Sequence, residues 1–270
     1  MKFSMSEAWR DATAMMSANR EVMLIVAGLF FLLPSLVMGL MMPGLQESMM
    51  ADPENAQAMV LDLYSSWWWL LLLVLLAQLV GYLGLLALLR DSSRPTVGEA
   101  LSAGLRGLLP ALGFYLLLGV GFALIGIVVV ALIRIGVSPA LAVIAALLCA
   151  VILVYVMVKL SLGLAVIAID KVSNPITAMA RSWQLTKGNS FRLFLFYLLL
   201  VLVYFVISIV AGVIVGALVL AVGTDTALLV NAVISGLLGA VLTMVIVAVI
   251  AAIHRQLSGP SAAAVSETFE

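Results

Sequence analysis

Few residues in this sequence are of the types that carry out chemistry. His254 is the single histidine and Cys149 the single cysteine, so a metal centre built from histidine and cysteine ligands and a disulfide framework are both excluded. The histidine pair of a metalloprotease, the nucleophile elbow of a hydrolase and the glycine-rich loop that binds phosphate are absent as well. We interpret His254, beside Arg255, as a cation at the C-terminal end of a helix, where the helix dipole favours positive charge. We therefore expect a protein that is not an enzyme and has no catalytic residue, cofactor or metal.

Lysine and arginine side chains are the remaining candidates for a site, and anionic lipid headgroups are the ligands that they would attract. Each cation near a membrane surface contributes about 1 kcal/mol to such binding. The candidate headgroup contacts are Arg94, Arg106, Lys159, Arg181, Lys187 and Arg192. The retention of cations in cytoplasmic loops explains the same residues without any ligand, and the sequence leaves both explanations open.

Lys159 belongs to an apolar segment that begins near Pro139 and whose apolar character continues to Asp170. About 30 Å of helix, at 1.5 Å per residue, separates Lys159 from the outer end of this segment. This distance brings it close to the inner headgroups, so we expect its ammonium group to extend toward them. No acidic residue falls within an apolar segment. Because ion-coupled transporters use such buried acids, the sequence disfavours a pump.

The elements that must position these residues are membrane-spanning helices. Hydrophobic residues make up 65% of the 270 residues and charged residues only 10%, whereas a soluble domain has about 25% charged residues. Six segments reach the roughly 20 apolar residues that a helix needs to cross a bilayer. They lie near 22–42, 67–89, 110–133, 140–160, 191–222 and 227–253. The sequence therefore predicts an all-α polytopic membrane protein with six transmembrane helices.

The distribution of charge predicts which side of the membrane each loop occupies. If both termini are cytoplasmic, all lysines and arginines except Arg134 lie toward the cytoplasm, as the positive-inside rule requires. The loop 43–66 and the last outer turn, which contains Asp225, then carry acids and no cation. Tyr64 and the tryptophans at 67–69 fall at the outer interface, where amphipathic rings are enriched.

Three segments at the predicted cytoplasmic edge have the pattern of amphipathic helices that begin at capping residues. The first begins with a capping box at Ser4 and Glu7, and the second with a capping box at Thr96 and Glu99. The third begins with an asparagine cap, Asn174, before Pro175. Gly188 is expected to end the third helix. Their predicted apolar faces are Met5, Trp9, Ala12 and Met16; Val97, Leu101, Leu105 and Leu108; and Ile176, Met179, Ala180 and Trp183. Such helices lie in the plane of the membrane surface.

Each amphipathic segment is followed by a pair of spans, which suggests an internal repeat. We predict one membrane domain, 1–257, with repeat units of about 4–89, 96–169 and 174–255, followed by a flexible cytoplasmic tail, 258–270. Short loops between spans are often amphipathic in any case, so the threefold repeat has a simple alternative.

Small residues recur every four positions in the last two spans. They are Ser208, Gly212 and Gly216 in the fifth span, and Asn231, Ser235 and Gly239 in the sixth. Because small residues at this interval let two helices approach closely, we expect these spans to pack as a tight hairpin.

The segment NPITAMARSWQLTKGNSFRLF, beginning at Asn174, resembles the glycerophosphoryl diester phosphodiesterase membrane domain family of bacteria. The resemblance rests on Ala178, Ser182, Trp183, Leu185, Thr186 and Gly188, on the earlier loop RPTVGEALSAGLRGLLP, and on hydropathy along most of the chain. Some members of that family carry a soluble phosphodiesterase barrel after the membrane part. Only SGPSAAAVSETFE follows the last span here, so the resemblance implies the membrane part alone and supplies no catalytic residue.

These observations favour a non-enzymatic protein of the bacterial inner membrane, a lipid-contacting scaffold or an accessory subunit of a membrane process. The alternative is a transporter or lipid translocase with a cavity between the helical repeats. Membrane lipids are the expected partners, together with a possible protein partner in the membrane. No basic tail suggests nucleic-acid binding, and the sequence does not define an oligomeric state.

Overall fold

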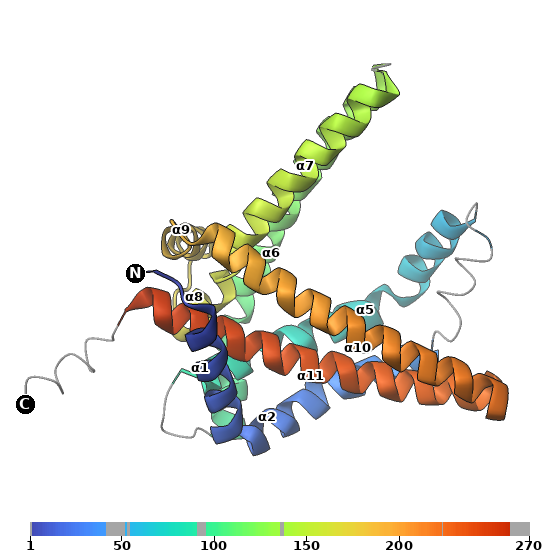
Figure 1. Ribbon diagram of the computed structural model, residues 1–270, viewed down its shortest axis with the longest axis horizontal. Coiled ribbons are helices and arrows are strands. Elements are labelled where there is room, and N and C mark those ends of the chain that lie inside the picture. The colour runs from blue at the N-terminus through green and yellow to red at the C-terminus, as the bar shows by residue number, and fades with distance from the viewer. Residues whose placement is uncertain are drawn as a thin grey trace, which may run out of the picture. The chain divides into compact units, whose positions relative to one another are not determined.

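The computed structural model describes residues 2–41, 52, 55–90, 96–135, 138–222 and 224–259. Within these ranges the regular secondary structure is entirely helical (Figure 1). The elements are α1 (Met5–Ala18), α2 (Arg20–Ala27), the π-helix η1 (Gly28–Leu32), α3 (Leu33–Met41), α5 (Ala56–Leu88), α6 (Val97–Arg134), α7 (Pro139–Leu160), α8 (Gly163–Ile169), α9 (Pro175–Leu185), α10 (Ser190–Val222) and α11 (Thr224–Ser258). The predicted tail lies outside the described residues beyond Gly259.

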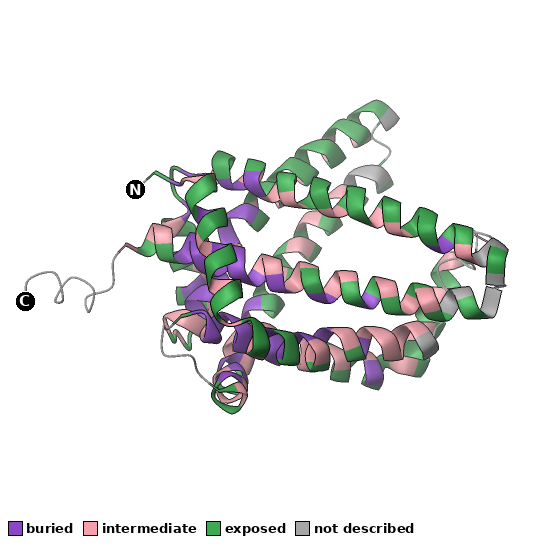
Figure 2. Ribbon diagram, turned by 60° about the horizontal axis from the view of Figure 1, so that its bottom comes forward, coloured by how far each residue is buried: buried purple, intermediate pink, exposed green. Residues whose placement is uncertain are grey.

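Six helical segments are long and apolar enough to cross a membrane, which confirms the predicted fold class. They are Arg20–Gly39, Ala56–Leu88, Val97–Ala131, Ala140–Ile169, Ser190–Leu218 and Leu229–Ser258. The first is built from α2, η1 and α3, and the fourth from α7 and α8. Exposed residues, green in Figure 2, run along much of the long helices, as expected of surfaces that a bilayer covers.

The middle amphipathic segment is not a separate surface helix, which corrects one prediction. Its capping box is present, because the Thr96 amide donates to Glu99 Oε2 at 2.8 Å and the Glu99 amide to Thr96 Oγ1 at 3.3 Å. The helix that begins there continues through Pro110 to Arg134 as α6. A proline removes one backbone hydrogen bond, but transmembrane helices tolerate this because neighbouring groups and local adjustments of the helix can satisfy the freed carbonyl.

All three amphipathic segments bury small residues rather than the bulky residues of their predicted faces. The buried positions stand four and eight residues after the caps: Ala8 and Ala12, Ala100 and Gly104, and Ala178 and Ser182. Trp9, Leu105, Ile176 and Trp183 are exposed. The protein thus leaves most of the bulky residues of the predicted apolar faces at least partly uncovered, as a helix that lies against a membrane requires, while small residues let the helices approach the rest of the protein closely. The shared spacing is what a threefold repeat requires, although the repeat itself stays a prediction.

The chain forms two compact units. Unit 1 comprises Met1–Met15, Arg106–Leu199 and Ala248–Glu270, and unit 2 comprises Met16–Leu105 and Leu200–Val247. Unit 1 gathers the start of α1, all of α8 and α9, and the end of α11 (Figure 1).

Unit 2 packs its helices through small residues. A Cβ added at Gly39 would lie 3.0 Å from Cβ of Ala232, and one added at Gly236 would lie 3.0 Å from Cδ1 of Leu32. Open space surrounds the corresponding positions of Gly212, Gly216 and Gly239. The predicted tight hairpin through those residues is therefore wrong, because the packed stripe of α11 is offset by one residue from the predicted one.

Candidate functional site

The amphipathic helix α9 lies at the centre of the candidate site in unit 1. Asn174 caps it, since Oδ1 accepts from the amide of Ile176 at 2.9 Å and from that of Thr177 at 3.4 Å. Pro175 occupies the first helical position, where its missing N–H costs nothing. After the helix ends, Gly188 has a positive φ of 81°, a conformation that glycine adopts without strain. The predicted cap and stop are both confirmed.

Two hydroxyl groups, one in α9 and one at its C-cap, lie against the break between α7 and α8. Ser182 Oγ donates to the carbonyl of Lys159 at 2.8 Å and accepts from the amide of Leu162 at 3.2 Å. The hydroxyl of Thr186 lies 3.3 Å from the Lys159 carbonyl. The shortest hydrogen bond of Thr186 is to the Ser182 carbonyl at 2.9 Å. The last carbonyls and first amides of helices lack partners within the helix, so the buried Ser182 hydroxyl satisfies groups that the break leaves unpaired. The expected continuous apolar segment to Asp170 is thus two helices.

Lys159 is covered by aromatic rings rather than extended to the edge of the span. The residue is only 3% exposed. Its Nζ lies 5.2 Å from the centre of the Trp183 ring and 5.7 Å from that of Tyr155. The two rings meet edge to face at 5.8 Å. Because the ring faces attract a cation, they stabilise the buried ammonium group.

One carboxylate joins three elements beside α9. Asp170 Oδ2 lies 2.6 Å from Nε of Arg181 and 3.3 Å from Nε2 of His254. Although burial alone raises the pKa of Asp170, the hydrogen bonds and charges of His254 and Arg181 outweigh it and hold the pKa below its ordinary value. The His254 side chain is 4% exposed. It is therefore a buried partner of Asp170 near the C-terminal end of α11, a contact that the sequence did not indicate.

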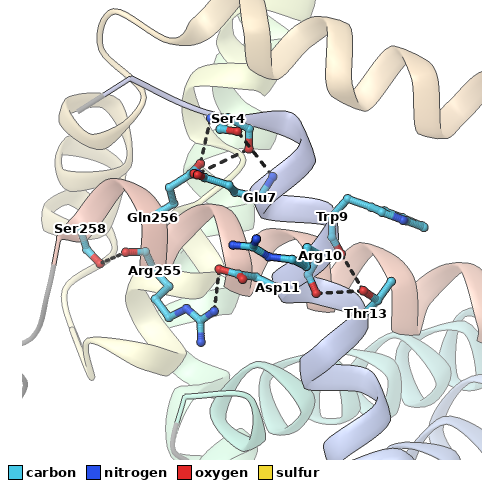
Figure 3. A network of polar contacts seen from close by, with 9 residues as sticks. All are labelled: Ser4, Glu7, Trp9, Arg10, Asp11, Thr13, Arg255, Gln256 and Ser258. Carbon is cyan, nitrogen blue, oxygen red and sulfur yellow. Dashed lines mark hydrogen bonds and ion pairs between the residues drawn. The ribbon is translucent and has the colours of Figure 1, made fainter.

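The N-terminal segment is fastened to the same region. The Phe3 amide donates to Asn189 Oδ1 at 2.9 Å, and the Phe3 ring lies 5.7 Å from that of Phe196. Figure 3 shows that α1 and the end of α11 are joined by a polar network. In it the Ser4 amide donates to Gln256 Oε1 at 3.2 Å, and an ion pair of 2.6 Å links Asp11 to Arg255.

A hollow of about 240 Å³ opens beside the C-terminal half of α9. It is lined by Arg181, Gln184, Leu185, Lys187, Asn189 and Leu257, and we call it the cation-lined hollow. Arg181 and Lys187 are both exposed. In the described part of the chain, Arg181 is engaged through Nε only, and the side chains of Lys187 and Gln184 make no hydrogen bond or ion pair. The hollow therefore presents donors that can accommodate an oxyanion.

The structure brings together two of the six candidate headgroup contacts, Arg181 and Lys187. Arg106 is exposed on α6, and Nη1 of Arg192 donates to the Phe3 carbonyl at 3.5 Å. Lys159 is covered, as described above, and Arg94 lies outside the described residues.

The sequence did not indicate the roles of Asp170, Asn189 and Tyr155. Asp170 was interpreted as the end of an apolar segment, and its partner His254 is 84 residues away. No local pattern marks such a contact. Among the residues that the structure describes, no group of three or more histidine, cysteine, aspartate or glutamate residues could hold a metal ion.

The chain matches a family described as a domain of unknown function, DUF7847, over residues 7–257. No curated protein and no solved structure matches the chain. These comparisons do not link it to the glycerophosphoryl diester phosphodiesterase membrane domain family, so that resemblance stays a prediction.

Proposed function

Since the chain belongs to the DUF7847 family, whose function is undefined, we propose from its geometry that it contacts anionic lipid headgroups through the surface around α9. In this proposal it is a non-enzymatic protein of the bacterial inner membrane, a scaffold or accessory subunit of a membrane process. Both termini and α9 are cytoplasmic.

The observation that carries the proposal is the division of α9 and the turn after it into three faces. Small and hydroxyl side chains fasten it to the protein. Ile176 and Trp183, seven residues and therefore about two turns apart, form an apolar edge and are 65% and 41% exposed. Arg181 and Lys187 are exposed cations. A helix with an uncovered apolar edge beside cations has the composition that binds the surface of an anionic membrane.

The position of Trp183 supports the same arrangement. Its ring contacts Tyr155, five residues before the last residue of α7, beside the break between α7 and α8. Tryptophan and tyrosine are enriched where a span meets the headgroups. In the proposal, Trp183 lies at the level of the headgroups, and α9 lies along the surface.

The grouping of both ends of the chain supports a common side for the termini. Phe3 and Ser4 contact Asn189 and Gln256 within unit 1. An even number of spans places both termini on the same side, and the excess of cations there favours the cytoplasm.

Site-directed labelling tests the proposal. Cys149 is the single cysteine, so a Cys149→Ala background allows Ile176→Cys and the matched control Thr177→Cys, one residue away and also exposed. After labelling with a fluorophore in bilayers, we expect the dye at 176 to be quenched by lipids with nitroxide-labelled chains. The dye at 177 should be quenched by aqueous iodide. Equal iodide quenching at both positions would remove the surface-helix proposal.

The same background tests orientation. In intact cells, a membrane-impermeant maleimide should label Thr226→Cys, at the start of α11, but not Thr177→Cys until the cells are opened. The reverse pattern would invert the proposed topology.

The proposed class of function needs a different measurement. A scaffold reconstituted in vesicles should leave the exchange of fluorescent lipids between leaflets at the rate of empty vesicles. Faster exchange, lost when the protein is heat-denatured before reconstitution, would instead support the lipid translocase alternative.

A further inference from the structure

We propose that the cation-lined hollow binds a single phosphate ester group, carried either by a lipid headgroup or by a small soluble molecule. This inference rests on the proposed function, because α9 also supplies the lipid-facing edge, and it adds the chemistry of one specific ligand.

The hollow carries positive charge that no described carboxylate fully neutralises. The described carboxylates of this unit are Glu7, Asp11 and Asp170, and each is engaged by other side chains. Glu7 accepts from Gln256 at 3.0 Å and Asp11 pairs with Arg255. Asp170 pairs with His254 and with Nε of Arg181. Within the described residues, Lys187 and the terminal nitrogens of Arg181 are thus left without a counter-ion.

The donor types match a phosphate ester. The terminal nitrogens of a guanidinium group present parallel N–H bonds that fit two oxygens of a phosphate, and an ammonium group adds a point charge with three donors. The amide of Gln184 is a further neutral donor on the same wall. A tetrahedral phosphate offers enough oxygens to accept from all three side chains at once. The two oxygens of a carboxylate lie in one plane with their acceptor sites, so a carboxylate fits donors from three directions less well.

The size and the walls of the hollow limit the ligand. Its volume of about 240 Å³ is below the roughly 300–1,000 Å³ of sites for drug-sized ligands, so a headgroup or small phosphate ester fits better than a nucleotide. Leu185 and Leu257 supply apolar contacts, which suit the carbon portion of a glycerol phosphate.

Two of the side chains that line the hollow are held in place by contacts with other segments. The Asn189 side chain, which forms part of its wall, accepts from the Phe3 amide, and Asp170 fixes Arg181 through Nε. A guanidinium held at one edge loses less conformational entropy on binding than a free side chain does. The ligand is therefore expected to bind at a defined 1:1 ratio rather than as a diffuse ion atmosphere.

The experiment uses the full chain in a non-ionic detergent and phosphate-free buffer. Native mass spectrometry and thermal shift measure binding of inorganic phosphate, glycerol 3-phosphate, phosphatidylglycerol and, as the zwitterionic comparison, phosphatidylcholine. We expect saturable 1:1 binding of at least one of the first three. Lys187→Ala should weaken it about fivefold, which corresponds to the roughly 1 kcal/mol of one cation.

Matched variants keep the test informative. Lys187 makes no described hydrogen bond or ion pair, so Lys187→Ala should fold normally. Arg181→Lys keeps the charge but removes the paired N–H donors, and it should also weaken binding. The double variant Lys2→Ala/Arg10→Ala removes two exposed cations elsewhere in unit 1 and should leave the affinity within about twofold.

The arms of the experiment distinguish the source of the phosphate and the two proposals. Binding of glycerol 3-phosphate supports a soluble ligand, and binding of phosphatidylglycerol alone supports a lipid headgroup. Unchanged affinity in Lys187→Ala and Arg181→Lys overturns the hollow as the site, and so does the absence of saturable binding of all three phosphate compounds. If the dye at position 176 is quenched by lipid in that case, the proposed function survives. If it is quenched by iodide instead, both fail.

Discussion

Nε of Arg181 lies 2.6 Å from Oδ2 of Asp170, which is eleven residues earlier in the chain, and the same oxygen also contacts His254. This oxygen joins the segment after α8 to α9 and to the end of α11. The guanidinium that would face a phosphate ligand is thus held by a carboxylate that also competes for its charge. The two effects can be separated by replacing Asp170.

Asp170→Asn is expected to lower stability in a pH-dependent way. Hydrogen bonds to charged groups contribute about 1.5–3 kcal/mol, and because the Arg181 side chain is 47% exposed, solvent screening reduces this to about 1 kcal/mol. The pKa of Asp170 lies below its ordinary value of 3.8 in the folded chain, since His254 and Arg181 outweigh the opposing effect of burial. Ionised Asp170 therefore stabilises the fold above that value, and the contribution is lost as the pH falls through the lower folded pKa.

The measurement is the thermal-unfolding midpoint of wild type and Asp170→Asn in detergent micelles. The difference between their midpoints should be present at about pH 5 and shrink toward about pH 3. A difference that stays constant over this range would show that the carboxylate charge does not contribute.

Asp11→Asn tests a second ion pair of the same length as the Asp170–Arg181 pair. The Asp11–Arg255 pair is also 2.6 Å long, but its side chains are 30% and 59% exposed. Exposed ion pairs contribute roughly 0–1 kcal/mol and are screened by salt. We expect Asp11→Asn to lower the midpoint less than Asp170→Asn does, and we expect added salt to remove most of its effect. An equal or larger effect of Asp11→Asn would indicate that burial does not decide the strength of these pairs.

The sequence predicted the spans and the caps because both depend on local information. Twenty apolar residues in a row indicate a span, and an asparagine before a proline indicates a helix start. The role of Ser182 needed the structure. Its partners, Lys159 and Leu162, are 23 and 20 residues away, and the need for a hydroxyl arises from a helix break that hydropathy does not reveal.

Ser182→Ala tests that role. The residue is fully buried, so its loss leaves the Leu162 amide without its hydroxyl acceptor, at a cost of about 1–3 kcal/mol. The midpoint should fall, and Ser182→Ala/Thr186→Val should lower it further, since Thr186 also approaches the Lys159 carbonyl. Ser173→Ala, at an exposed position, is the control and should leave the midpoint unchanged. A Ser182→Ala protein as stable as this control would show that the hydroxyl is dispensable.

The division of bulky and small residues on the amphipathic helices has a physical reason. In a soluble protein, the bulky apolar face of a surface helix turns toward the core. Lipid tails are as apolar as leucine, so in a membrane the bulky residues can face the bilayer while small residues make the protein contacts. Trp183 and Ala178 illustrate the exchange, since the tryptophan is 41% exposed and the alanine is fully buried.

The common register of the small residues yields a test that spans both units. Ala8, Ala100 and Ala178 each stand four residues after a cap and are 1%, 2% and 0% exposed. Replacement by leucine at any of them forces extra volume into a close helix contact, which costs about 1–3 kcal/mol. Ala180→Leu is the control, because Ala180 is exposed on α9 and leucine is as good a helix former. We expect all three variants to lower the unfolding midpoint, whereas the control should not. If leucine is tolerated at one of the three positions, that helix does not share the close packing of the other two.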